Sequence, residues 1–441
     1  MVRTCFLLFL LLSSGLLARG QSLSVIAEFD RKADSMKLAI RTTPSDYTEK
    51  RRAYYVSPEG NDARNGRSPQ RAVRSLDRVN TLALKAGDVV LFERDGLWRG
   101  VLQTKEGVTY SAYGSGEKPR LYGSPCDAAE EGRWYETGTP NVYVYDRELP
   151  DDIGTLVFNH GESCALKVMK AENRDLKHDL EFLHDYLGTK RLYLYSSEGN
   201  PAQRFNSIEL LVKTNVVYAK SDVVIDNLCI KYCGAHGIGS GTLRGLTVTN
   251  CELGWIGGSI QGENLFGRSF PTRYGNAIEV YGGCDSFRVD HCYIYQVYDA
   301  AITHQYSTGG NNHVVQKNIT YTNNLVEDCT YSIEYFLGKA DNAAERYMDN
   351  VVIRDNLLRR AGFGWGQQRP DKDTPAHIQS WTHHRNQASR FVIENNVFDR
   401  ATEKLLKIAA DKPEWLPALR GNTYIESSGI SVDTLGSGRS R

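Results

Sequence analysis

The chain has 441 residues and carries 53 basic against 53 acidic side chains, so its formal charge at pH 7 is zero. Proteins that bind nucleic acid usually present a strongly basic surface, so this balance argues against nucleic acid as a partner. The 40 glycines and 25 tyrosines suit a fold with many turns and a surface able to contact sugars.

The first 20 residues have the pattern of a signal peptide. Arg3 supplies a positive start, residues 6–17 form an apolar stretch, and Ala18-Arg19-Gly20 resembles a small-x-small cleavage site. The apolar stretch is too short to span a bilayer, so membrane insertion is not expected. We therefore expect a secreted or periplasmic protein, in which residues 21–50 form a leader segment without a clear repeat.

Residues 51–125 are predicted to form an N-terminal cap and the first coils of a stacked fold. The segment 75–84 has apolar residues at helical spacing, with Ser75 as a candidate N-cap and Gly87 as the stop. A strand at 88–92 follows. A helix over the open end of a solenoid would hide its apolar residues and its unpaired strand edge.

Residues 126–218 interrupt this organisation. Four apolar stretches separated by turn residues predict antiparallel strands at 134–135, 142–145, 156–159 and 191–195. We interpret the segment as a small β insertion, which is either a packed flap or one wall of a substrate groove.

A short phrase recurs six times between residues 220 and 400. Each copy alternates apolar and variable residues, as a half-buried strand does, and ends in Asn, Asp or His. The copies begin at Val223, Leu246, Phe287, Ile319, Val351 and Phe391. Their spacing of 23 to 41 residues matches one solenoid coil plus insertions of differing length. Parallel stacking of such strands buries a continuous apolar column, which predicts a parallel β-helix over 219–425, followed by a C-terminal tail at 426–441.

The Asn, Asp or His that ends each phrase belongs to a first column, and the residue after it belongs to a second column. The first column should adopt the left-handed turn that Asn tolerates and form a ladder of stacked amides, with His291 as one structural member. Its members are Asn227, Asn250, His291, Asn323, Asp355 and Asn395. In the second column we interpret Cys251 and Cys292 as stacked free thiols, with a disulfide framework as the alternative. No metal site is expected, because Cys229 and Cys233 lack a second pair at ligand spacing.

The N-terminal motifs resemble those of a known superfamily. Residues 54–62 read Tyr-Tyr-Val-Ser-Pro-Glu-Gly-Asn-Asp, and after the helix residues 86–92 read Ala-Gly-Asp-Val-Val-Leu-Phe. Together with the Tyr-Gly-x-Gly-x-x-Pro segment at 113–119, they resemble the start of the pectin-lyase-like right-handed parallel β-helix superfamily of carbohydrate-active enzymes. The resemblance covers about residues 53–425 and implies this all-β fold, with a polysaccharide in a groove along one sheet. Members include lyases, hydrolases, epimerases and adhesins, so it does not define the reaction.

A second strand follows each ladder position. Ile238, Ile278, Ile302 and Ile333 align as an inward column, so the residues after them, Gly239, Glu279, Thr303 and Glu334, should point outward. Strands in a sheet lie about 4.7–4.9 Å apart, which places carboxylates two coils apart at roughly 9–10 Å. Inverting glycosidases separate their carboxyl groups by about 6.5–9.5 Å. We predict Glu279 and Glu334 as catalytic residues, with Asp299 as a closer partner for either.

Long loops follow several of these strands on one edge of the predicted solenoid, where repeat proteins commonly build binding sites. The last of these loops carries Asp373, His377, Gln379, Trp381, His383 and His384. The residues predicted to contact the sugar are Asn276, His304, Tyr335, Trp365, His377, Trp255 and Arg273.

Three functions fit this pattern, and the sequence favours a glycoside hydrolase without a cofactor. A polysaccharide lyase or uronate epimerase would need a Lys, Arg or Tyr base, with Ca²⁺ or Arg to neutralise the uronate. The central outward column contains neither Lys nor Arg, which disfavours this alternative. A non-catalytic carbohydrate-binding solenoid is the third possibility, although its coils would be expected to be more regular. The oligomeric state is not predicted.

Overall fold

The structure, a computed structural model, describes residues 24–45, 47, 52–169, 175–262, 271–307, 309–369, 375–382 and 384–425, with the backbone of a last strand at 430–434. The predicted signal peptide lies outside the described residues, as do Asp373 and His383. Within these ranges, no helix is long and apolar enough to cross a membrane.

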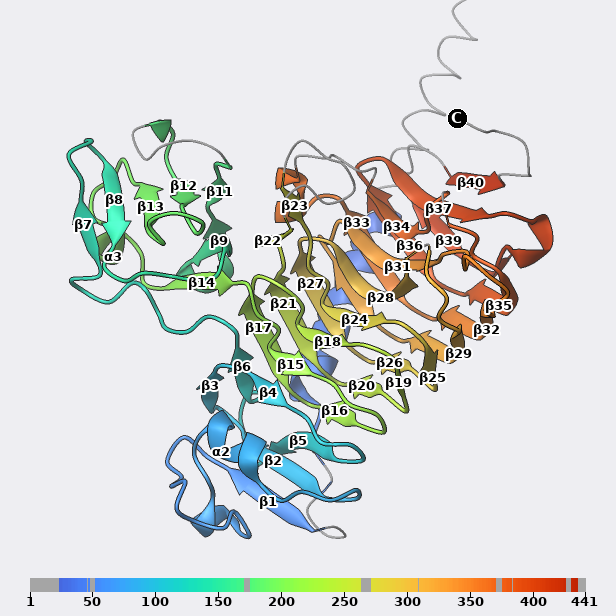
Figure 1. Ribbon diagram of the computed structural model, residues 1–441, viewed down its shortest axis with the longest axis horizontal. Helices are drawn as coiled ribbons and strands as arrows, with labels where there is room; N and C mark the ends of the chain where they lie inside the picture. The colour runs from blue at the N-terminus through green and yellow to red at the C-terminus, as the bar shows by residue number, and fades with distance from the viewer. Residues whose placement is uncertain are drawn as a thin grey trace, which may run out of the picture.

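The strands of successive coils stack along one axis and form three long parallel sheets (Figure 1). Sheet A contains β1 (Ala53–Val56), β2 (Val89–Glu93), β5 (Thr109–Tyr113), β16 (Val224–Asp226), β20 (Thr247–Thr249), β26 (Arg288–Asp290), β29 (Val314–Thr322), β32 (Arg346–Arg354), β35 (Ala388–Glu394) and β38 (Ala418–Arg420), with the short β19 (Leu243–Arg244) and β25 (Cys284–Asp285). Sheet B contains β3 (Leu97–Arg99), β6 (Arg120–Tyr122), β17 (Cys229–Cys233), β21 (Glu252–Ile256), β27 (Tyr293–Val297), β30 (Leu325–Glu327), β33 (Leu357–Ala361), β36 (Val397–Ala401) and β39 (Thr423–Ile425). Sheet C contains β4 (Leu102–Gln103), β15 (Val217–Tyr218), β18 (Ile238–Ser240), β24 (Ile278–Tyr281), β28 (Ala300–Tyr306), β31 (Tyr331–Leu337), β34 (Ala376–Gln379), β37 (Lys404–Ala410) and β40 (Ile430–Thr434).

Each coil contributes a strand to sheet A, then B, then C, and the next coil stacks on it. The predicted parallel β-helix is therefore confirmed. It extends beyond residue 425, because β40 pairs with β37 within the segment predicted as a tail.

The two predicted inward columns are also confirmed. In sheet A, paired residues stack in register and are fully buried; they are Ile225, Val248, Val289, Tyr321, Ile353 and Ile393. In sheet C, Ile238, Ile278, Ile302 and Ile333 stack in the same way, and the column continues through Ile378 and Leu406. Burial of these aliphatic side chains, at about 25 cal/mol per Å² of apolar surface, is the main favourable contribution to this fold.

The turn between sheets A and B has the predicted left-handed backbone, but the amide ladder lies one residue later than expected. All six residues of the first column have φ between 50° and 58°. Among them, Asn250 donates to the Asp226 carboxylate at 2.8 Å and Asn323 donates to the Asp290 carboxylate at 3.1 Å. The ladder is formed by Asn324, Asn356 and Asn396, whose amides are linked at 3.0 and 2.9 Å. These side chains are buried, where an amide that has lost water must find a protein partner.

The cysteines follow the predicted pattern. None of the eight described cysteines forms a disulfide, and Cys251 and Cys292 occupy the ladder column in the coils that precede the amides. Each thiol donates to a main-chain carbonyl of the preceding coil, Cys251 to Ile225 at 3.6 Å and Cys292 to Val248 at 3.7 Å.

The capping helix is shorter than predicted. It is α2 (Leu76–Thr81), and Ser75 caps it by accepting a bond from the Arg78 N–H at 3.1 Å. The helix ends at Thr81, well before Gly87, where the backbone of Leu82 becomes extended. The side chain of Asn80 bonds to the main chain of Val101 and Gln103 in the first coil.

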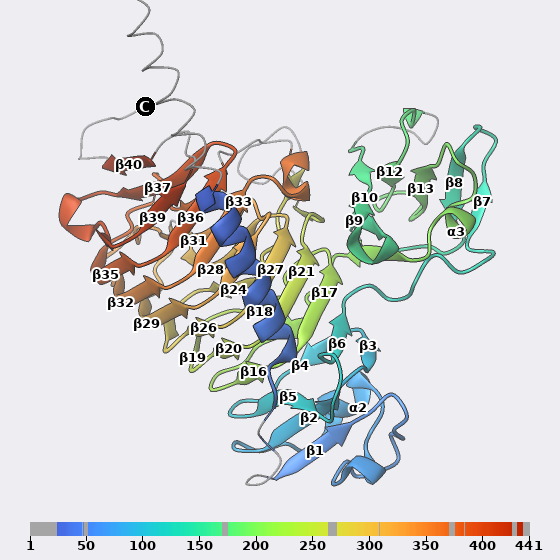
Figure 2. The same cartoon turned by 180° about the vertical axis from the view of Figure 1, so that it is seen from behind.

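The leader segment contains a helix that the sequence analysis missed. Residues 24–42 form a helix that lies diagonally across the outer face of sheet B (Figure 2). Its apolar side, which includes Ala33 and Ile40, packs on the sheet residues Tyr293, Leu325, Leu357 and Val397. Ion pairs fix it at both ends: Lys37 to Glu327 at 2.8 Å, Arg41 to Glu252 at 2.9 Å, and Asp30 to Arg359.

The predicted β insertion folds into two small layers beside the solenoid (Figure 1), and their strands are antiparallel except for one parallel pair in the second layer. Sheet D contains β9 (Ile153–Phe158), β10 (Ser163–Cys164) and β14 (Ile208–Val212). Sheet E contains β7 (Trp134–Glu136), β8 (Val142–Tyr145), β11 (Leu166–Lys167), β12 (Glu181–His184) and β13 (Leu192–Tyr195). The two layers share an apolar core, and Val157 and Leu211 of sheet D pack on Tyr232, Tyr298 and Trp365 of the solenoid.

Candidate active site

Three carboxylic acids meet where the chain passes from sheet B into sheet C. Glu279 lies on β24 and Glu334 on β31, and both pair with Thr303 of the intervening β28. Asp299 lies at the corner between β27 and β28. All three side chains are at least nine-tenths buried. Strand alternation therefore places the two glutamates on the outer face of sheet C, two coils apart, at roughly 9–10 Å between their backbones.

Glu279 is held by three neutral or weakly basic donors. Its Oε2 accepts bonds from the amides of Asn276 and Gln305, both at 2.6 Å, and its Oε1 lies 3.3 Å from Nε2 of His236. Nδ1 of His236 accepts the main-chain N–H of Asn276 at 3.1 Å. A neutral His236 therefore carries its proton on Nε2, directed at Glu279. This set of bonds fixes the orientation of the Glu279 carboxyl group.

Asp299 forms an ion pair. Its Oδ1 accepts a bond from Nη1 of Arg369 at 2.5 Å, and both side chains are buried. The guanidinium comes from the loop after η5 (Trp365–Gln368), so a residue about 70 positions away in sequence completes this corner.

Glu334 is the group most changed by its environment. Its side chain is 4% exposed, and its Oε1 accepts a bond from Nε1 of Trp381 at 2.6 Å. Burial, followed by the negative charge of Asp299, raises the pKa of Glu334 well above the usual value, and the charge of Glu279 adds to this. The Trp381 bond and the charge of Arg369 act in the opposite direction. We conclude that the surroundings of Glu334 favour its protonated form.

A tyrosine borders the same cluster. Tyr274 is half-buried, and burial together with the charges of Glu279 and Asp299 raises its pKa to about 12. Its phenol therefore stays protonated at neutral pH and can donate a hydrogen bond.

The outward column is longer than the sequence indicated. It continues from Glu334 to Gln379 and then to Lys407, whose ammonium lies 5.0 Å from the centre of the Trp381 ring. Within the described ranges, the buried Thr303 Oγ1 and Gln379 Oε1 have no hydrogen-bond partner in the protein. Buried polar atoms are almost always satisfied, so these two, on either side of Glu334, are exceptions to that rule.

Two residues predicted to contact sugar lie inside the solenoid. His304 is fully buried, its Nδ1 lies 2.8 Å from the Tyr321 hydroxyl, and burial lowers its pKa to about 3. Tyr335 stacks on His304 and contacts Phe391 in the main core. The prediction of sugar contact is wrong for both, because each follows an inward isoleucine by two residues and therefore shares its face.

Four other residues that were predicted to contact sugar instead contact other parts of the protein. Trp255 and Trp365 pack in the apolar cluster beneath the insertion, and Nε1 of Trp365 donates to the Gln296 carbonyl at 2.9 Å. Arg273 donates to the carbonyls of Gly258 and Gly154 at 2.6 and 3.0 Å. His377 is buried, with its ring nitrogens 2.9 Å from Ser332 Oγ and 3.0 Å from the Arg400 carbonyl. Direct sugar contact is contradicted for these four residues, because packing against the neighbouring coils and the insertion uses their rings and polar groups.

Asn276, the seventh, lies at the site but bonds to Glu279 and to the Ala300 N–H at 2.9 Å. The sequence analysis missed His236, Gln305 and Arg369. His236 precedes Ile238 by two residues, as Asn276 precedes Ile278, so this offset could have identified it.

The chain is similar to known proteins in solved structures, at low sequence identity. No protein-family model and no curated protein matches the sequence. Among solved structures, the chain is similar to XylC in complex with xylose, at 10% identity over 84% of this chain and 69% of that chain, with a TM-score of 0.49. It is also similar to the GH136 lacto-N-biosidase from Eubacterium ramulus, at 13% identity over 84% and 67% of the two chains and a TM-score of 0.32. The polygalacturonase from Erwinia carotovora ssp. carotovora matches at 9% identity over 89% and 98%, with a TM-score of 0.37. Function is therefore argued from the site.

Proposed function

We propose that the protein is a glycoside hydrolase that cleaves an oligosaccharide or polysaccharide at the corner between sheets B and C. The observation that carries this proposal is the buried carboxyl cluster, in which the environment raises the pKa of Glu334 and holds Glu279 with three donors. Glycoside hydrolysis needs two carboxyl groups whose surroundings push their pKa values apart.

In this mechanism Glu334 is the general acid and protonates the glycosidic oxygen as the bond to the sugar breaks. Glu279 is the general base and removes a proton from the attacking water. The backbone separation of roughly 9–10 Å lies at the upper edge of the range for inverting enzymes, so we propose inversion. Asp299 acts through its charge, which helps Glu334 to keep its proton. Asp299 is the poorer candidate for the base, because its carboxylate already accepts a bond from the guanidinium of Arg369.

The charge of the site supports a neutral glycan as substrate. Three carboxyl groups face one another here, while the guanidinium of Arg369 is paired with Asp299 and that of Arg273 with main-chain carbonyls. A polyuronate would bring further negative charge into this cluster. Like charges in a buried site are strongly unfavourable.

One observation favours a polysaccharide lyase as the second candidate. Lys407 lies in the outward column, on the strand that follows Gln379, and could serve as the base. In that mechanism Glu279→Gln and Glu334→Gln would retain activity and Lys407→Ala would lose it.

The decisive experiment identifies the new chain ends released from a panel of neutral and uronate-containing glycans. A hydrolase produces reducing ends without the ultraviolet absorbance of an unsaturated uronate, whereas a lyase produces that absorbance. Glu334→Gln should then lower kcat/KM by about 10²–10⁴ on a natural glycan. The loss should be much smaller on an aryl glycoside whose leaving group needs no proton.

Glu117→Gln is a matched control, since Glu117 is exposed in the first coils. Full activity of Glu334→Gln on the natural glycan would refute the assignment of the acid. Export remains part of the proposal and rests on the pattern of the first 20 residues alone. Cleavage after Gly20, seen by mass spectrometry of protein recovered outside the cytoplasm, would test it.

A further inference from the structure

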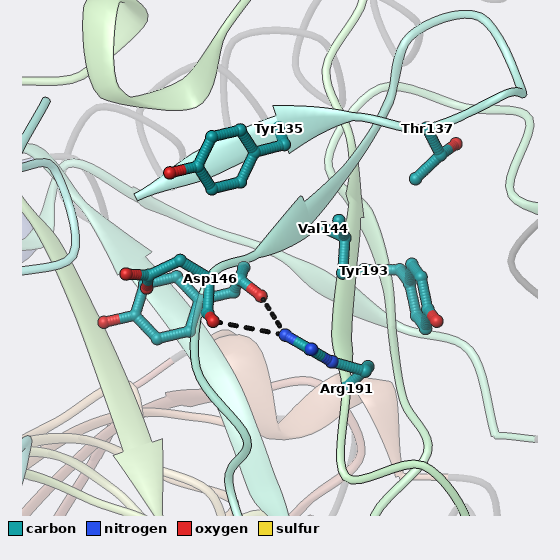
Figure 3. A pocket seen from close by; sticks show the side chains of 7 residues that line it. Tyr135, Thr137, Val144, Asp146, Arg191 and Tyr193 are labelled. Atoms are coloured by element: carbon teal, nitrogen blue, oxygen red, sulfur yellow. Dashed lines mark hydrogen bonds between the residues drawn. The ribbon is translucent and has the colours of Figure 1, made fainter. Parts of the chain in front are cut away.

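The β insertion carries a hollow that the proposed reaction does not use. It has a volume of about 510 Å³ and lies on the face of sheet E that is turned away from the insertion's core (Figure 3). Pockets that bind small molecules usually measure about 300–1,000 Å³. The residues that line it are Tyr135, Thr137, Val144, Tyr145, Asp146, Arg191 and Tyr193.

Strand register explains the shape of this hollow. Tyr135 of β7 and Tyr193 of β13 both pair with Val144 of β8, so the three side chains form one row on the same face. Figure 3 shows the two rings on either side of the short Val144 side chain. Two strand spacings separate the tyrosine backbones by about 9–10 Å. A ring held between two aromatic faces at van der Waals distance needs about 7–8 Å.

The two tyrosines differ in their packing: Tyr193 is half-buried and packs against the apolar cluster of Val142, Leu176 and Leu183, whereas Tyr135 projects from the sheet. The core side of the same strands is filled by Trp134 and Tyr145, which are buried. Tyr135 is 57% exposed, one of the most exposed large side chains among the described residues. An exposed aromatic ring that faces a second ring across a slot is typical of a binding surface rather than of a stability requirement.

A fixed guanidinium lies at the edge of the slot. Nη1 of Arg191 donates to the carbonyls of Tyr145 and Asp146 at 3.4 and 3.2 Å (Figure 3). Asp146 is itself bound by Arg133 at 3.1 Å, and Arg133 also pairs with Glu130. The two arginines and two acids balance, so the hollow has no excess charge. The other N–H groups of Arg191 can donate to a ligand oxygen.

We propose that this slot is an accessory glycan-binding site that holds a neutral pyranose unit between Tyr135 and Tyr193. A pyranose presents apolar C–H faces to the two rings and hydroxyl oxygens to Arg191, and it needs no charge partner. The strands β7, β8 and β13, which line the slot, lie on the side of the insertion that is distant from the solenoid (Figure 1), so the site is separate from the carboxyl cluster. The choice of a neutral glycan as ligand rests on the proposed function.

The test is affinity electrophoresis of the full chain in gels that contain arabinoxylan, galactomannan, mixed-linkage β-glucan or polygalacturonate. Glu334→Gln serves as the parent to prevent turnover. At least one neutral polysaccharide should retard the parent. Tyr135→Ala removes one of the two rings and should lower the apparent affinity about fivefold or more, which corresponds to about 1 kcal/mol. Tyr135→Phe keeps the ring and should bind as the parent does. Leu187→Ala, an exposed apolar residue of the same insertion outside the slot, is the matched control.

The proposal is overturned if no neutral polysaccharide retards the parent, if only polygalacturonate does, or if Tyr135→Ala is retarded as strongly as the parent. It is also overturned if light scattering shows that Tyr135→Ala converts a dimer into a monomer, because the slot would then be a contact between two copies. The wild-type chain, assayed on the same glycans, separates this proposal from the proposed function. Hydrolysis without Tyr135-dependent binding refutes only the accessory site, whereas Tyr135-dependent binding without any cleavage refutes only the enzyme.

Discussion

Two substitutions at the carboxyl cluster should move the pH profile in opposite directions. A general acid works while protonated, so kcat/KM should fall as the pH rises through the pKa of Glu334. Asp299→Asn removes a negative charge that raises this pKa, so the alkaline limb should move to lower pH. Trp381→Phe removes the hydrogen bond that lowers it, so the limb should move to higher pH.

The size of each shift follows from simple electrostatics. Two unit charges about 7 Å apart at an effective dielectric constant of about 20 interact by about 2.4 kcal/mol, which corresponds to about 1.7 pKa units. We therefore expect Asp299→Asn to lower the alkaline limb by about 1–2 pH units. Loss of one hydrogen bond to a charged carboxylate is worth about 1.5–3 kcal/mol, which gives a shift of about one unit or more for Trp381→Phe. Phenylalanine keeps the ring that Trp381 places against Tyr331.

The assay is kcat/KM against pH on a substrate found in the glycan panel, since this parameter reports the pKa values of the free enzyme. Opposite shifts would support Glu334 as the acid. Shifts in the same direction, or unchanged limbs in both variants, would refute the reasoning and require another group as the proton donor.

Three further predictions concern stability. Glu334→Gln should stabilise the protein at neutral pH but not near pH 4. Because the pKa of Glu334 is raised in the folded state, the wild type loses about 1.4 kcal/mol of stability per pH unit between the unfolded pKa of about 4.3 and the folded pKa. Equal gains in stability at both pH values in urea titrations would contradict this prediction. Ile302→Asp places an unpaired charge in the inward column and should cost several kcal/mol or prevent folding, whereas Ile302→Val should cost about 0.5–1.5 kcal/mol; equal melting temperatures would disprove the inward assignment. Asn356→Ala removes the buried hydrogen bonds that its side chain makes with Asn324, Asn396 and the Tyr321 carbonyl and should cost about 2–4 kcal/mol. This is well above the cost expected for Asn323→Ala at the half-buried turn position before the ladder, as measured by thermal unfolding.

The sequence predicted the solenoid and the position of the acids because both follow from local alternation. Once Ile278 and Ile333 are placed inward, the residue after each must face outward, whatever the rest of the chain does. The same rule, extended by one residue, would have placed His304 and Tyr335 inside. Their side chains are of types that bind sugars, which suggested a sugar contact, but their register in the strands places them inside the solenoid.

The remaining errors concern contacts between distant segments. Trp255 and Trp365 look like sugar-stacking residues in isolation, and only the docking of the insertion through Val157 and Leu211 shows that their rings are covered. Arg369 and Trp381 reach the acids from loops whose paths the sequence pattern does not define. The helix at 24–42 is a different case, because Ile26, Phe29, Ala33, Met36 and Ile40 have the spacing of an amphipathic helix and were readable from the sequence.

That helix has a consequence for the order in which the chain reaches its native state. Its docking surface on sheet B is built by coils that follow much later: Arg41 bonds to a residue 211 positions away, and Asp30 to one 329 positions away. Contacts this distant in sequence form only after the chain between them is in place. The segment that is synthesised early therefore docks late, and a chain that stops before its last coils would leave the first half of the helix without a surface. Docking of residues 24–42 therefore indicates that the coils that form its docking surface are complete.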